Sequence, residues 1–259
     1  MRHFRAPRRK AMRWGVILLA VGAYGTTLIA TAPANLAAAT LQRESNGSLR
    51  LVEARGTLWL GSGQIELGDA NGRVGMSIPI TWQLQHVSLI SARLAFEITV
   101  EPQSQPVRVT LSRSGLDVKN LAFRLPARVL GLAVPRLAPL GLMGEVLLHA
   151  DALTISRDRF LGTATLHWRA AASTLTPISP LGDYEIQIIG DGTTMAASLR
   201  TIGPGAALRI EGKGAWKIGS KPALLATATV SPQQRLELAP VLRMIAVERK
   251  SGTFEMQLQ

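Results

Sequence analysis

The sequence predicts a mainly β protein, with a single transmembrane helix at the N-terminus followed by an antiparallel β-sheet and a few short helices. Three observations support this fold class. A long uncharged run follows a basic N-terminal segment, and apolar and polar residues alternate through most of the remaining chain. Gly, Pro, Asn and Ser separate the alternating stretches at about ten-residue spacing, without long helices between them, which favours an antiparallel meander.

The uncharged run extends from Trp14 to Leu41, and its first 19 residues, 14–32, are almost wholly apolar. As a helix, this part spans roughly 28 Å, close to the thickness of about 30 Å of a bilayer's hydrocarbon core. The preceding residues 1–13 hold six cations and no acid. Four of these cations lie nearest to the apolar run: Arg8, Arg9, Lys10 and Arg13. Because flanking cations stay in the cytoplasm, we expect them to set the topology, with everything after residue 41 outside.

A cleaved signal peptide is the alternative interpretation of the first 35 residues. Ala30-Thr31-Ala32 has the small-x-small form of a cleavage site. Two features favour a retained anchor instead. The apolar run is longer than the core of about 7–15 residues that signal peptides carry. In addition, Pro33 would directly follow the cut.

Composition narrows the classes of function. Half of the net charge of +12 comes from the six cations of the tail, and no basic cluster follows residue 13, so we expect no nucleic-acid partner. The absence of cysteine excludes thiol catalysis and cysteine-type zinc sites. We therefore divide the chain into a basic cytoplasmic tail (1–13), an anchor with a short membrane-proximal extension (14–41) and an exported β-rich domain (42–259).

Alternation with a period of two residues marks the expected strands. The clearest case places four apolar residues on one face: Ile78, Ile80, Trp82 and Leu84. Thr81 and Gln83 point to the opposite face, so we expect the face with Trp82 to be buried. The same pattern recurs at 49–53, 64–67, 94–100, 107–111, 163–169, 184–188, 207–211, 223–230 and 253–259.

Two stretches interrupt the strand pattern and predict short helices, residues 125–137 and 238–247. Each has a proline, Pro126 or Pro240, at a plausible first helical position. Each stretch is followed by a glycine and then a strand. This similarity suggests two tandem units, at about 42–150 and 151–259.

The sequence contains no recognisable set of catalytic residues. His86, His149 and His167 lie in or at the ends of strand patterns, and none has a second histidine at metal-ligand spacing. The sequence contains no nucleophile elbow, phosphate-binding loop or dinucleotide fingerprint. We therefore predict no catalytic residue, no cofactor and no metal site, and we interpret Trp59, Trp82, Trp168 and Trp216 as packing residues of strands.

One stretch carries a family resemblance. Residues 54–61 read ARGTLWLG, and residues 80–84 add the strand ITWQL. Together with the basic anchor in front, these motifs resemble the type II secretion system protein N family, with further similarity at 121–130, 144–146 and 238–258. The motif residues are interpreted as structural: Gly56, Thr57, Leu58, Trp59, Gly61 and Trp82. Leu60 departs from the pattern, which favours serine or another small residue there.

The resemblance implies a non-enzymatic inner-membrane accessory protein of a type II secretion machine, with its bulk in the periplasm and other secretion subunits as partners. It also implies an elongated, curved sheet of the AsmA-like sort, and it carries over no catalytic residue. The alternative function is an apolar-groove protein that handles or transports lipid at the envelope, since the inner face of a long sheet can lack a full cover.

Overall fold

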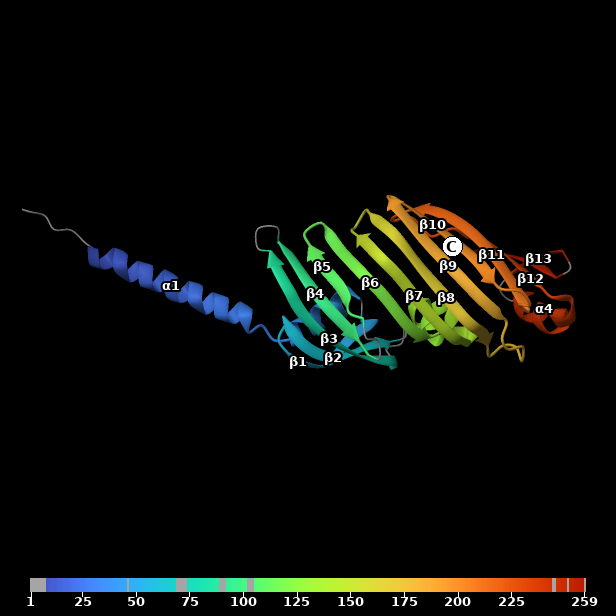
Figure 1. Cartoon of the computed structure of the whole chain (residues 1–259), viewed down its shortest axis with the longest axis horizontal. Coiled ribbons are helices and arrows are strands. Elements are labelled where there is room, and N and C mark those ends of the chain that lie inside the picture. The colour runs from blue at the N-terminus through green and yellow to red at the C-terminus, as the bar shows by residue number, and fades with distance from the viewer. Residues whose placement is uncertain are drawn as a thin grey trace, which may run out of the picture.

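The strands form one continuous antiparallel sheet (Figure 1). The computed structural model describes residues 8–45, 47–68, 74–88, 92–101, 105–243, 246–250 and 252–258. Within these residues the sheet has 14 strands. Each strand pairs with its neighbour in the sequence, except that β14 lies between β12 and β13. The predicted antiparallel meander is therefore confirmed, as is the small helical content.

The bounds of the strands follow the alternating stretches of the sequence closely. The strands are β1 (Leu49–Gly56), β2 (Leu60–Gly68), β3 (Val74–Ser88), β4 (Arg93–Val100), β5 (Val107–Ser112), β6 (Gly115–Pro126), β7 (Leu142–Ile155), β8 (Phe160–Ser173), β9 (Gly182–Gly192), β10 (Thr194–Ile202), β11 (Leu208–Lys217), β12 (Leu224–Val230), β13 (Val247–Lys250) and β14 (Thr253–Leu258). Short helices connect β6 to β7 and β12 to β13, and most of the other described connections are short turns.

Two helices precede the sheet, where the sequence suggested one helix with an extension. α1 (Arg8–Ala30) begins inside the basic tail, and α2 (Asn35–Glu44) follows after a short break. Pro33 explains the break, because a proline lacks the N–H that a continuing helix needs and its ring disfavours helical geometry at the preceding residue. Among the described residues, no helix combines the length and the apolar character that crossing a membrane requires.

The two faces of the sheet differ as the alternation predicted. Ile80 and Trp82 are buried on one face of β3, and Trp82 is only 7% exposed. Thr81 and Gln83 are exposed on the other face. We call these the inner face and the outer face of the sheet. Trp82 therefore lies in a packed region of the inner face.

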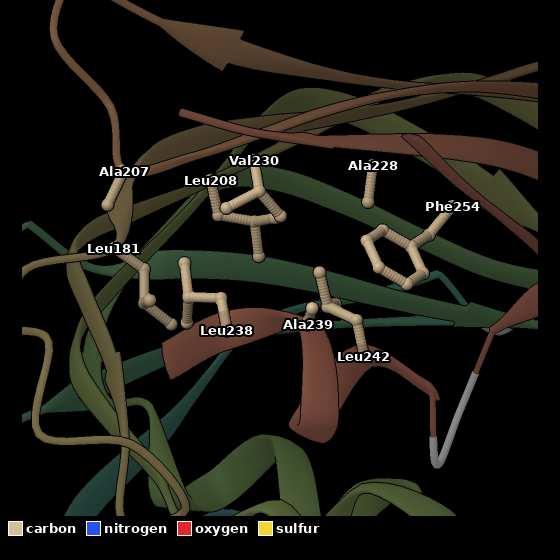
Figure 2. Packing of buried hydrophobic residues seen from close by; sticks show 9 residues of the cluster. All are labelled: Leu181, Ala207, Leu208, Ala228, Val230, Leu238, Ala239, Leu242 and Phe254. Atoms are coloured by element: carbon tan, nitrogen blue, oxygen red, sulfur yellow. The ribbon is translucent and has the colours of Figure 1, made fainter. Parts of the chain in front are cut away.

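The core is divided into three clusters along the inner face. The first cluster joins Ala34, just before α2, to Ile80, Trp82 and Val100. The second lies around β5 to β8 and contains Val107, Val118, Ala150 and Leu153. In the third, α4 (Arg235–Arg243) points Leu238, Ala239 and Leu242 at the last strands, where Phe254 is fully buried (Figure 2). The inner face is thus covered locally and has no single thick core.

The short helices begin at other residues than those predicted. Pro126 ends β6, and α3 (Arg128–Ala133) and the 3-10 helix η1 (Pro135–Leu140) follow it. Pro240 lies inside α4. Pro232 occupies the first turn of the helical segment there, in the 3-10 helix η2 (Pro232–Gln234) that leads into α4. The sheet runs unbroken through residue 150, and the division into tandem units stays a prediction.

We predict that Trp82→Ala destabilises the protein much more than Gln83→Ala does. Removal of a buried aromatic costs roughly 3–5 kcal/mol. This is a large part of the free energy of unfolding of a typical domain, which is about 5–15 kcal/mol. Gln83 is exposed on the outer face, so its removal should stay within about 0.5 kcal/mol. Urea midpoints of the whole chain in detergent would measure both changes. Equal midpoints would contradict the packed position of Trp82.

Candidate functional site

The most specific site in the structure is the contact between the end of α1 and the turn between β1 and β2. We call it the joint, and it comprises residues 29–34 and 56–61. The backbone N–H of Leu58 donates to the Ala32 carbonyl at 2.8 Å, and the N–H of Ala34 donates to the Gly56 carbonyl at 3.3 Å. Pro33 forms an antiparallel bridge with Thr57. The segment between the two helices thus pairs with the sheet as a very short extra strand.

Trp59 connects the joint to the helix itself. Its indole Nε1 donates a hydrogen bond to the Ile29 carbonyl at 2.8 Å. The Ile29 carbonyl lies in the last turn of the helix and also accepts from the N–H of Ala32 at 3.1 Å, so the indole is its second donor. The carbonyl of Trp59 accepts from the N–H of Leu84 at 2.6 Å. Trp59 therefore contacts both α1 and β3, and it lies in a turn, where the sequence suggested a strand.

The turn takes its shape from Gly56 and Thr57. Gly56 has φ +87°, and a Cβ there would lie 2.5 Å from the Leu60 carbonyl oxygen, so only glycine fits. The Thr57 hydroxyl accepts from the N–H of Trp59 at 3.3 Å and from the N–H of Leu60 at 3.1 Å. The N–H of Thr57 donates to the Leu60 carbonyl at 2.8 Å. These bonds hold the turn in one conformation.

Gly61 and Trp82 support the turn from the sheet. A Cβ on Gly61 would lie 2.4 Å from the Trp82 ring, so the absence of a side chain makes room for the indole. The Trp82 Nε1 donates to the Thr57 carbonyl at 3.2 Å. The structure therefore brings all six predicted motif residues together: Gly56, Thr57, Leu58, Trp59, Gly61 and Trp82. That their role is structural stays a prediction.

Sequence reasoning missed the partners of this motif. Ile29, Ala32 and Ala34 contribute backbone groups, which leave no signature in the side chains. Pro33 was the available signal, because a proline directly after an apolar run indicates an extended segment that can pair with a strand. The cations that we predict to set the topology, Arg8, Arg9, Lys10 and Arg13, lie in the first turns of α1, and their side chains fall outside the described part of the structure.

Each of the two histidines whose side chains are described has a carboxylate beside it. The Nε2 of His149 lies 3.1 Å from the Asp151 carboxylate, and the Nε2 of His167 lies 3.6 Å from the Glu185 carboxylate. The side chain of His86 is not among those described. Within the described residues, no group of three or more His, Cys, Asp or Glu is placed to hold a metal ion.

Among the described titratable groups, two have clearly shifted pKa values, and both lie far from the joint in the sheet. Burial, with a smaller effect from Asp183, raises the pKa of the Tyr184 phenol, whose hydroxyl donates to the Leu208 carbonyl at 2.8 Å. Hydrogen bonds from Arg243 and from the Gly252 N–H lower the pKa of Glu248. Both groups support packing at the C-terminal end of the sheet, since Tyr184 remains a neutral donor and Glu248 a charged acceptor.

We predict that Gly61→Ala destabilises the joint, because the new methyl group must displace the Trp82 ring. Overpacking of this kind typically costs about 1–3 kcal/mol. The expected result is a lower urea midpoint and faster proteolysis between α1 and β1. Gly25→Ala is the matched control, since a Cβ at Gly25 meets no atom within 4 Å. Unchanged stability of Gly61→Ala would show that the indole moves freely.

Comparison with known proteins adds the family. A family model described as type II secretion system (T2SS), protein N, matches residues 47–257, a range that includes the turn of the joint and all of the sheet except the last residue of β14. Searches among curated proteins and among solved structures found no match. The family consists of secretion accessory proteins, is not a known enzyme family, and is associated with the cell envelope and with other secretion subunits. The chain therefore belongs to the type II secretion system protein N family.

Proposed function

We propose that this protein is a non-enzymatic subunit that α1 holds in the inner membrane and whose sheet acts as a periplasmic scaffold for other secretion subunits. One observation carries the proposal. α1 meets the sheet at its first strands, and all further strands extend away from the end of the helix (Figure 1). In this proposal the sheet extends from the membrane surface into the periplasm, and its long face is accessible to partner proteins.

The anchor is supported by the surface of α1. From residue 19 onward, where its side chains are described, the helix exposes large apolar groups in several directions, including Leu19 (75% exposed) and Tyr24 (71%). Transfer of apolar surface out of water is favourable by a free energy of about 25 cal/mol per Å², so such a helix is more stable in an apolar environment. In this proposal residues 1–13 are cytoplasmic, 14–41 form the anchor and its extension, and 42–259 are periplasmic.

The scaffold role is supported by the length and the polarity of the sheet. At about 4.8 Å between neighbouring strands, 14 strands reach roughly 60 Å. The outer face carries ion pairs between adjacent strands, such as Arg108 with Glu97 at 2.9 Å and Arg200 with Glu185 at 2.6 Å. A long, polar and regular face suits reversible contacts with periplasmic domains of other subunits.

A second candidate, lipid handling, has one specific observation in its favour. Apolar residues from neighbouring strands lie in register across the inner face of β7 to β10: Leu148, Leu166, Ile186 and Leu199. All four are only half-buried, in contrast to the fully packed clusters on either side. This row is the part of the inner face where an acyl chain could lie.

The topology leads to a direct prediction. A reporter that is active only in the periplasm should be active when fused after Gln259. Exchange of Arg8, Arg9, Lys10 and Arg13 for Glu should reduce this activity, because flanking cations set the orientation. A silent reporter on an intact fusion would contradict the proposed topology.

Photo-crosslinking from adjacent residues tests the scaffold role against lipid handling. Ile186 and Gln187 follow each other on β9, so their side chains lie on opposite faces. A photoreactive residue at Gln187, on the outer face, should yield adducts with another secretion subunit in intact cells. The same residue at Ile186 should yield few protein adducts. Lipid adducts at Ile186 without protein adducts at Gln187 would contradict the scaffold role and favour lipid handling.

A further inference from the structure

The turn between β1 and β2 ends in three consecutive apolar residues: Leu58, Trp59 and Leu60. We call them the hairpin tip. Leu58 pairs through its backbone with Ala32, and the Trp59 indole binds the end of α1, so both are occupied inside the joint. Leu60 is 61% exposed and points into solvent. The joint therefore explains the position of Trp59 but leaves most of the large apolar side chain of Leu60 exposed.

The position of the tip is fixed relative to the helix. The hydrogen bond of 2.8 Å from Trp59 to Ile29 ties the tip to the last turn of α1. If α1 spans the membrane, its last turn lies at the periplasmic surface of the bilayer. The tip then lies at the same depth, where tryptophan side chains are favoured because one end is apolar and the other forms hydrogen bonds.

A cation lies beside the tip. Arg55 and Leu60 line the same shallow hollow on the outer face, together with Thr81 and Gln83. Glu97 also lines the hollow, but its carboxylate already accepts hydrogen bonds from Arg108 and from Gln85. Within the described residues Arg55 forms no ion pair, so its guanidinium is available to an anion.

We propose that the hairpin tip is a second membrane contact that sits in the headgroup layer of the outer leaflet. Leu60 reaches the acyl boundary, Trp59 lies at the interface, and Arg55 binds the phosphate of an anionic phospholipid, for which a guanidinium is well shaped. This inference rests on the proposed membrane anchor. It gives the exposed Leu60 a role that a polar side chain could not fill.

The chain contains no cysteine, so single-cysteine variants can be labelled without background. Three variants of the full chain carry a nitroxide label: Leu60→Cys at the tip, Leu28→Cys on α1 and Leu225→Cys on β12. Leu225 is the matched control, because it is 57% exposed but lies on a strand remote from the joint. Each variant is reconstituted into vesicles of phosphatidylethanolamine with a minor share of phosphatidylglycerol.

The measurement compares collisions of each label with oxygen, which enters lipid, and with a water-soluble nickel chelate. We expect the labels at 28 and 60 to be shielded from nickel and the label at 225 to be fully accessible. A label at 60 as accessible as that at 225, with the label at 28 shielded, would overturn the inference alone. If the label at 28 is also accessible, the anchor itself is wrong and the inference falls with it.

The role of Arg55 is tested in the same vesicles. Replacement of phosphatidylglycerol by neutral phosphatidylcholine should reduce the shielding of the label at 60. Arg55→Gln should abolish this dependence on lipid charge, whereas Arg209→Gln, an exposed arginine on β11, should retain it. An unchanged dependence in Arg55→Gln would overturn the assignment of Arg55 as the phosphate ligand.

Discussion

An open sheet leaves a row of unpaired backbone groups at each edge, and this constraint governs both ends of the molecule. At the first edge, Pro33 and its neighbours pair with the end of β1, and α2 packs beside them. At the other edge, β13 is only four residues long and carries Glu248, Arg249 and Lys250. One edge is therefore covered by the segment that leads from the helix, and the other is short and charged. Both devices discourage pairing between copies of the chain.

The same topology limits how much apolar surface can be buried. A single sheet has one inner face and no second sheet to cover it, so burial is concentrated where a helix or loop crosses that face. Such cover exists around Trp82 near α2 and around Phe254 near α4. Between them, the apolar row of β7 to β10 stays half-buried. Long-range strand pairing must therefore contribute much of the stability, which fits an extended shape better than a globular one.

Sequence reasoning predicted the parts of this structure that are periodic. The two-residue alternation identified the strands and the buried face of Trp82, because side-chain direction follows directly from strand geometry. The rule that a proline marks the first turn of a helix was applied to the wrong residue. Pro232, and not Pro240, lies in the first turn of the helical segment there. Only one side of the joint could be predicted from the sequence. Its turn is a recognisable motif, but Ile29 and Ala32 contribute backbone carbonyls, which leave no pattern in the side chains.

The joint also bears on whether the first residues are retained. The cleavage site of the alternative interpretation, residues 30–32, overlaps the segment that pairs with the motif. The carbonyl of Ala32 and the N–H of Ala34 are both bonded to the turn, on either side of Pro33. A chain cut after Ala32 would lose Ile29, and with it the hydrogen-bond acceptor of the Trp59 indole. The motif tryptophan would then have a free donor beside an exposed Leu60. The turn is therefore complete only when α1 is present, which supports the proposal that the helix is retained as an anchor.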